Sequence, residues 1–141
     1  MTFNTEILSL VENLRKGYAK SLSSLAHEEG LTPCEGSVLS FLRFNPGYDA
    51  PSDITRLIQI TKGNVSSSVH SLEEKGYLVS KTDEKDHRLS HLTLTEKSFP
   101  FINRVSAMRA KWVKKLMAGF SSSETKELSS FLLRINENIT K

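Results

Sequence analysis

The segment from Lys62 to Ser71 is rich in small side chains that form hydrogen bonds. Besides its serines it contains the amide of Asn64 and the imidazole of His70, and all these groups can bond to the base edges or phosphates of nucleic acid. Lys62, together with the free N–H groups of a helix start, suits a phosphate. The segment therefore predicts a nucleic-acid contact surface. The alternative that these residues leave open is an ordinary solvated helix face.

A second candidate group lies in the polar stretch DEKDHR, residues 83–88. Asp86 and Arg88 are two residues apart on a strand edge and share a face, so the carboxylate could hold the guanidinium extended toward an A·T-rich minor groove. Lys85 and His87 flank the pair. The alternative is a solvated turn, in which the salt bridge contributes almost nothing.

Apolar residues at steps of three and four predict a long helix at the start of the chain, ended by Gly30. Thr32, Pro33 and Glu35 suit the N-cap, first residue and capping-box partner of a second helix. We expect that helix to run to about Phe44. The stripe of the first helix consists of Phe3, Ile7, Leu10, Val11, Leu14, Tyr18, Leu22 and Leu25.

The serine-rich segment belongs to a further helix, which Thr61 can cap and which Gly76 ends in a left-handed conformation. It follows a short helical segment, SDITRLIQI, whose inward side chains should be Ile54, Leu57 and Ile58. The inward side chains of the serine-rich helix itself should be Val65, Val69 and Leu72, with Ser68 on the same side. Its outward residues should be Gly63, Ser67 and His70, flanked by Asn64, Ser66 and Ser71.

After Gly76 the apolar period changes to two, and residues 77–83 and 89–95 are expected to form two strands of a hairpin. Another long helix should run from Glu96 to Phe120, with Pro100 in its first turn, and a serine should cap a last helix. Two helices joined tightly around QITKG and followed by a hairpin form a winged helix-turn-helix pattern. In that pattern the second helix enters the DNA major groove.

The predicted fold is mainly α with a small β-hairpin wing, as a winged helix-turn-helix lobe on a helical dimerisation base. We expect residues 1–31 to form an N-terminal dimerisation helix, residues 32–95 the DNA-binding lobe, and residues 96–141 the C-terminal dimerisation helices. The apolar stripes of the terminal helices flank the lobe, so they should pack on one another and complete a homodimer.

The stretch NVSSSVHSLEEKGYLVSKTDEKDHRLSHLTLTEK, residues 64–97, resembles the recognition helix and wing of the MarR family (multiple antibiotic resistance regulators). The family pattern is Leu-Glu-x-x-Gly, then Asp-x-Arg, then Leu-Thr-x-x-Gly. The residues that match it are Leu72, Glu73, Gly76, Asp86, Arg88, Leu94 and Thr95. The resemblance implies a homodimer that binds a pseudo-palindromic operator in double-stranded DNA and is commonly released by a small ligand or by thiol oxidation.

Several positions depart from the family pattern. Ser67 stands where the family often has arginine, so bidentate base readout by this helix is missing. His70 and Ser71 replace an acidic and a basic residue, and Ser98 replaces the last glycine. Residues 46–95 hold 6 basic and 7 acidic side chains, net −1, whereas residues 96–141 hold 9 and 4, net +5. We therefore expect modest, strongly salt-dependent DNA affinity, with specificity from hydrogen bonds, the wing arginine and DNA shape.

Other chemistry finds little support. The single cysteine, Cys34, lies in the first turn of a predicted helix. We interpret it as a half-buried small residue, and the alternative is a redox-sensitive thiol. The histidines are scattered, without metal-site spacing or an acidic cluster, so we expect no metal. They are His27, His70, His87 and His91. No glycine-rich phosphate loop, nucleophile elbow or carboxylate pair is present, so an enzyme is not expected.

No cofactor is expected. A small aromatic effector remains an alternative, but the residues that would bind it are unknown. Its pocket could be lined by Phe101, Met108, Trp112 and Met117, although plain core or dimer interface is the favoured interpretation of these residues. The charged N-terminus lacks the apolar core of a signal peptide, and no apolar stretch is long enough for a membrane span, so we expect a cytoplasmic chain. A net charge of +3 leans toward an anionic partner.

The expected function is a sequence-specific DNA-binding transcriptional regulator, a repressor released by a small ligand. The residues expected to contact DNA are Thr61, Lys62, Asn64, Ser66, Ser67 and His70 on the helix, and Lys85, His87 and Arg88 on the wing, with Asp86 orienting the arginine. The alternative is a winged-helix dimer that acts as a protein-interaction module with little or no DNA binding.

Overall fold

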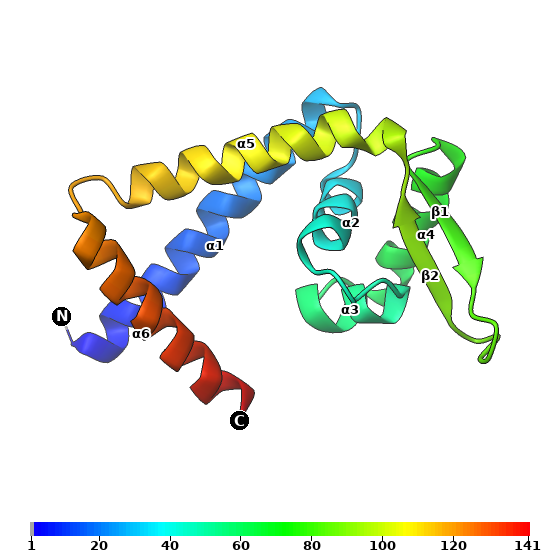
Figure 1. The fold of residues 1–141 in the computed structure, drawn as a ribbon. Helices are drawn as coiled ribbons and strands as arrows, with labels where there is room; N and C mark the ends of the chain where they lie inside the picture. The colour runs from blue at the N-terminus through cyan, green and yellow to red at the C-terminus, as the bar shows by residue number, and fades with distance from the viewer. Residues whose placement is uncertain (1) are drawn as a thin grey trace. The chain divides into compact units, whose positions relative to one another are not determined.

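The computed structural model describes residues 2–141, which form helices and one antiparallel hairpin (Figure 1). In chain order the elements are α1 (Phe3–Glu28), α2 (Pro33–Phe44), α3 (Pro51–Ile58), α4 (Lys62–Glu74), β1 (Leu78–Thr82), β2 (Ser90–Leu94), the short 3-10 helix η1 (Glu96–Ser98), α5 (Phe99–Leu116) and α6 (Ser122–Thr140). This is the mainly helical fold with a β-hairpin wing that the sequence predicts. The chain divides into two compact units, residues 1–106 and 107–141. The assignment of dimerisation and DNA-binding segments stays a prediction.

Local hydrogen bonds set the predicted helix starts. Thr32 and Glu35 form the expected capping box: the Glu35 N–H donates to Thr32 Oγ1 at 3.1 Å, and the Thr32 N–H donates to Glu35 Oε1 at 2.9 Å. Thr61 caps α4, since its Oγ1 accepts from the Asn64 N–H at 3.2 Å. Between α3 and α4, Gln59 adopts a left-handed conformation with φ of 53°.

The core of the first unit forms where α2 and α3 pack against α4 and β2. Val65 and Leu72 are fully buried and Ser68 is buried beside them, which confirms the predicted inward face of α4. The expectation for α3 is wrong at one position. Ile54 is fully buried, but Leu57 is 43% exposed, so this helix of eight residues buries a narrower face than its apolar pattern suggests.

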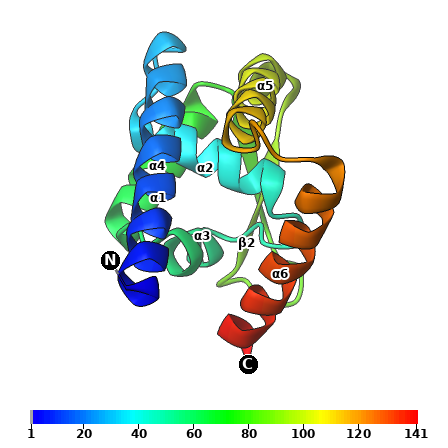
Figure 2. The same cartoon turned by 90° about the vertical axis from the view of Figure 1, so that its left-hand side faces the viewer.

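Helices α1 and α2 approach each other closely at Gly36. A Cβ atom built on Gly36 would lie 2.8 Å from the Cβ of Ala26, and Ala26 is completely buried. Figure 2 shows α2 running across α1. Glycine is therefore required at this crossing by packing, because any larger side chain would push the two helices apart.

The hairpin pairs β1 and β2 in antiparallel register, with Lys81 opposite His91. Each strand is one residue shorter at both ends than predicted, although a single backbone hydrogen bond still joins Asp83 to Leu89 at one end and Thr95 to Tyr77 at the other. The predicted helix from Glu96 is also shorter. A 3-10 turn occupies its start, and Gly119, with φ of +86°, follows its end at Leu116.

Ser98, at the place of the family's glycine, is completely buried, and its Oγ donates to the Thr95 carbonyl at 2.6 Å. It does not have a positive φ, so a serine fits there without backbone strain.

Long apolar side chains remain exposed near both ends of the chain. Those on α1 are Phe3, Leu8, Leu10 and Val11, and those on α6 are Phe131, Leu132, Leu133, Ile135 and Ile139. Helix α6 contains no buried residue. Its start is the predicted serine cap, since Ser121 Oγ accepts from the Glu124 N–H at 3.1 Å. Within residues 2–141, none of the helices combines the length and apolarity that a membrane crossing requires.

Candidate nucleic-acid interface

The outward face of α4 carries the polar residues that the sequence singled out. Those exposed are Thr61, Lys62, Gly63, Asn64, Ser66, Ser67 and His70. His70 Nε2 lies 3.1 Å from Glu74 Oε1, so the imidazole is tied to the next turn of the same helix. The hydroxyls of Ser66 and Ser67 remain accessible, and this face offers hydrogen-bonding groups without a cation beyond Lys62.

Ser71, expected to flank this face, instead bonds inward. Its Oγ donates to Glu35 Oε2 at 2.8 Å, and the residue is half-buried. The position lies at the edge of the helix face, within hydrogen-bonding reach of the Glu35 carboxylate of α2. Ser71 therefore joins α4 to α2 and leaves the outward face to its neighbours.

Glu35 is the centre of a buried network that sequence analysis did not foresee beyond the capping box. Its side chain is 2% exposed, and Lys75 Nζ donates to both carboxylate oxygens, at 3.0 and 3.2 Å. Burial alone would raise the pKa of Glu35, but the Thr32 N–H, Lys75 and Ser71 together lower it below the ordinary value. Because these partners come from α2 and α4, the network holds the C-terminal end of the candidate recognition helix, α4, against α2.

The wing places Asp86 and Arg88 as predicted. Arg88 Nε and Nη2 donate to the two Asp86 oxygens at 3.1 and 3.3 Å, and the Arg88 N–H also donates to Asp86 at 3.0 Å. The Arg88 side-chain and backbone hydrogen bonds lower the pKa of Asp86. With 90% of its side chain exposed, Arg88 is extended rather than folded onto the protein. Lys85 and His87 are exposed beside it.

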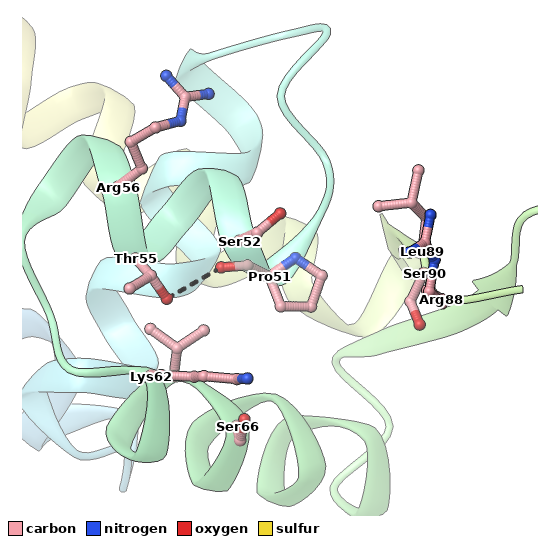
Figure 3. Close-up of a pocket in the computed structure, with 10 residues that line it drawn as sticks. Pro51, Ser52, Thr55, Arg56, Lys62, Ser66, Arg88, Leu89 and Ser90 are labelled. Atoms are coloured by element: carbon pink, nitrogen blue, oxygen red, sulfur yellow. Dashed lines mark hydrogen bonds between the residues drawn. The ribbon is translucent and has the colours of Figure 1, made fainter. Parts of the chain in front are cut away.

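A cleft of about 420 Å³ lies between α3, the first turns of α4 and the turn end of the wing. Its lining includes Lys62 and Ser66 from α4, Arg88 from the wing, and Arg56 from α3. In Figure 3, Lys62 extends below α3, and Arg88 lies on the opposite side of the cleft. Arg56 lies at the edge of the cleft and points away from Lys62. Three cationic side chains and several hydroxyls thus border one concave surface, which suits an anionic backbone.

Arg56 was not among the predicted site residues. It pairs with Asp53 on α3, Nη2 to Oδ1 at 3.0 Å, and this spacing of three residues is visible in the sequence as an ordinary helix-surface pair. Only the three-dimensional position of α3 beside the cleft marks it as a candidate contact.

His91 has two acidic neighbours that the sequence spacing did not reveal. Its Nδ1 lies 2.8 Å from Asp49 Oδ1 and its Nε2 lies 2.8 Å from Asp83 Oδ1. Asp49 is 42 residues from His91 in the sequence, and Asp83 is eight residues away on the other side of the wing turn. Sequence spacing alone could therefore not reveal these contacts. Within residues 2–141, no group of three or more histidine, cysteine or acidic residues is arranged to hold a metal ion.

Two further candidates can be located. Cys34 is half-buried, and its Sγ donates to the Asn64 carbonyl at 3.7 Å, so the thiol abuts the first turn of α4. Phe101, considered as a ligand-pocket residue, is completely buried in the core of the first unit and is therefore a packing residue.

Comparison with known proteins agrees with this geometry. A model of the MarR family matches residues 29–89. YkoM of Bacillus subtilis, an uncharacterized HTH-type transcriptional regulator, is 27% identical over 135 residues, which cover 91% of this chain and 87% of the relative. A MarR transcriptional regulator from Methanosarcina mazei has a similar structure, with a TM-score of 0.77 and 20% identity over 95% of this chain and 96% of that one.

Streptococcus pneumoniae FabT, solved in complex with DNA, is similar over 99% of this chain and 98% of its own, with a TM-score of 0.70 and 20% identity. At such identity the solved structures establish the fold, whereas the family model covers the helix-turn-helix and most of the wing. With the capped α4 and the Asp-x-Arg wing in place, these matches show that the chain is similar to transcriptional regulators of the MarR family.

Proposed function

We propose that this protein regulates transcription by binding a pseudo-palindromic site in double-stranded DNA as a homodimer, and that it acts as a repressor. We also propose that it does so in the cytoplasm, where the DNA is. The observation that carries the proposal is the position of the polar α4 face beside the cleft that Lys62, Arg56 and Arg88 border. The DNA complex of FabT, a structural neighbour, supports it.

In this arrangement α4 lies in the major groove, where Asn64, Ser66 and Ser67 face base edges. His70 lies one turn farther along the same face. Such hydroxyl and amide contacts discriminate bases less sharply than a bidentate arginine. Phosphates bind the cleft, and Arg88 reaches the adjacent minor groove from the wing. The protein-interaction alternative is not favoured, because the relatives are regulators of transcription.

The test is selection of a binding duplex from a random double-stranded library, followed by fluorescence anisotropy of the selected duplex across a salt series. We expect log K to fall steeply and linearly with log salt, because binding releases counterions from the phosphates. A library from which no duplex is enriched, together with a flat salt response, would leave the protein-interaction module as the better explanation.

Arg88→Ala should weaken binding of the selected duplex by about 1 to 3 kcal/mol, or roughly fivefold to more than a hundredfold. The matched control is Arg43→Ala, which removes the same charge from the exposed end of α2. The control should bind nearly as well as the wild type. Equal losses in the two variants would mean that the wing arginine acts only through net charge.

The proposed homodimer rests on the exposed apolar side chains of α1 and α6. A soluble chain rarely leaves such a set uncovered, and a second copy is the partner that the family suggests. Light scattering coupled to size exclusion should give twice the mass of the chain. Leu133→Glu, a charge placed on α6 where 63% of the leucine is exposed, should shift the mass toward the monomer.

Release by a small aromatic effector is the remaining part of the proposal. Trp112 is half-buried, and an indole is a side chain that packs well against an aromatic ring. A panel of aromatic acids should include one that raises the melting temperature and weakens binding to the selected duplex. A panel in which no compound does either would favour a constitutive regulator.

A further inference from the structure

His91 occupies a bridging position between the wing and the rest of the lobe. It lies on β2, and its two ring nitrogens reach carboxylates of two different segments: Asp49 in the loop between α2 and α3, and Asp83 at the start of the wing turn. Both nitrogen–oxygen distances are 2.8 Å. The ring thus links one segment that belongs to the helical part of the lobe to another that belongs to the wing.

This geometry requires a particular form of the imidazole. Two carboxylates can only accept hydrogen bonds, and a neutral imidazole has a single N–H, so only the imidazolium satisfies both contacts. The hydrogen bonds to Asp49 and then Asp83 raise the pKa of His91 above its ordinary value, against the opposing effect of burial. The same contact with His91 is the first cause of the lowered pKa of Asp83.

The other charged groups around His91 do not provide an alternative partner. Lys81 lies directly opposite in the β-ladder and disfavours a second positive charge, so the two carboxylates must outweigh it. On α3, Asp53 is paired with Arg56.

Asp83 transmits the contact to the tip of the wing. Its second oxygen accepts from the backbone N–H groups of Lys85 at 2.9 Å and Asp86 at 2.7 Å. Asp86 in turn holds Arg88. A continuous series of hydrogen bonds therefore runs from the loop carboxylate through His91 and Asp83 to the arginine of the wing.

The backbone attachment of β2 does not depend on this side chain. The Leu92 N–H donates to the Asp49 carbonyl at 2.8 Å, so the strand stays anchored when the imidazole changes its protonation. Deprotonation of His91 should consequently release the wing turn without unfolding the lobe.

We propose that His91 is a positioning residue for the wing, and that its doubly donating form fastens the wing turn to the loop between α2 and α3 so that DNA affinity falls when the ring loses a proton. The inference rests on the proposed DNA-binding function. Because the folded-state pKa of His91 is above its ordinary value, both hydrogen bonds to Asp49 and Asp83 are fully formed below about pH 6.5. They are lost as the pH rises through the folded-state pKa.

The experiment measures the affinity of wild type and variants for the selected duplex from pH 6 to pH 9 at constant ionic strength. The wild type should lose roughly threefold more affinity over this range than His91→Gln, whose amide cannot change its charge. His27→Gln is the matched control, since it removes an exposed histidine of α1 and should keep the wild-type profile. The readout is the difference between the profiles, which cancels every contribution that the wild type and the variant share.

Asp49→Asn provides a second, independent variant. With one carboxylate replaced by an amide, the midpoint of the pH profile should move to lower pH, and the C2–H proton resonance of His91 should titrate at correspondingly lower pH. A merely structural contact would change the affinity at every pH by the same factor. A His91→Gln profile parallel to that of the wild type, or an Asp49→Asn midpoint that does not move, would overturn the proposal.

The two inferences fail in different ways. If the wild type binds no duplex at any pH, the proposed DNA-binding function fails. If it binds the selected duplex with a steep salt response but without a His91-dependent pH profile, only the positioning role fails.

Discussion

Two carboxylate-centred networks hold the lobe, and they differ in solvent exposure. Around Glu35 the carboxylate is 2% exposed and joins α2 to α4, whereas Asp83 and Asp49 beside His91 are 28% and 47% exposed and join the wing to a loop. The first network has lost its hydration, so each of its partners is needed for the fold. The second keeps water as a substitute partner and can open without cost to the core.

The two networks therefore respond to pH in opposite directions. The lowered pKa of Glu35 gives a stabilisation that is present above its ordinary value near 4.5 and is lost as the pH falls through the folded-state value. The raised pKa of His91 gives a contact that is lost as the pH rises. Acid should unfold the lobe, while mild alkali should loosen only the wing.

The largest effect is expected from Glu35→Ala. It leaves the Thr32 N–H and the Ser71 hydroxyl without their acceptor and should lower the free energy of unfolding by about 2 to 4 kcal/mol. Urea denaturation followed by circular dichroism measures the loss. The control is Glu12→Ala, an exposed glutamate paired with Arg15 on α1, which should show no measurable loss. Similar midpoints for both variants would show that the buried network contributes nothing.

A smaller effect is expected from Lys75→Met. The carboxylate of Glu35 keeps two donors but loses its cation, so burial should raise its pKa and the free energy of unfolding should fall by about 1 to 3 kcal/mol. The acid-unfolding midpoint should move to higher pH. Lys20→Met, at an exposed position of α1, is the control. An unchanged acid midpoint would mean that Thr32 and Ser71 alone hold the carboxylate ionised.

The smallest effect is expected in the exposed network, from Asp86→Asn. The guanidinium of Arg88 keeps its charge but loses a bidentate partner, so affinity for the selected duplex should fall only about twofold to threefold. The melting temperature should not change, because both groups are solvated in the free protein. A loss as large as that of Arg88→Ala would show that Asp86 does more than orient the arginine.

The parts of the fold that depend on nearby residues were predictable from the sequence. The caps at Thr32 and Thr61 and the Asp86–Arg88 pair each involve residues two or three apart, and the inward face of α4 follows from helical period. Leu57 was misjudged because an apolar pattern does not tell how much of a short helix is covered.

The contacts that cross the fold were not predictable. Glu35 and Lys75 are 40 residues apart, and Asp49 and His91 are 42 apart. A capping glutamate and an isolated histidine have ordinary sequence contexts, and only the packing of α2, α4 and the hairpin brings their partners into reach. Arg56 belongs to the same class, because the cleft it borders exists only once α3 and the wing are placed.

The left-handed Gln59 between α3 and α4 has a consequence for mutational tolerance. Its side chain is exposed, so a substitution would be expected to pass unnoticed. Yet at φ of 53° a β-branched residue is strained, while glycine or asparagine is accommodated. A valine or isoleucine there would force the turn to open and change the angle between the two helices. Accessibility is therefore a poor guide to which residues this turn accepts.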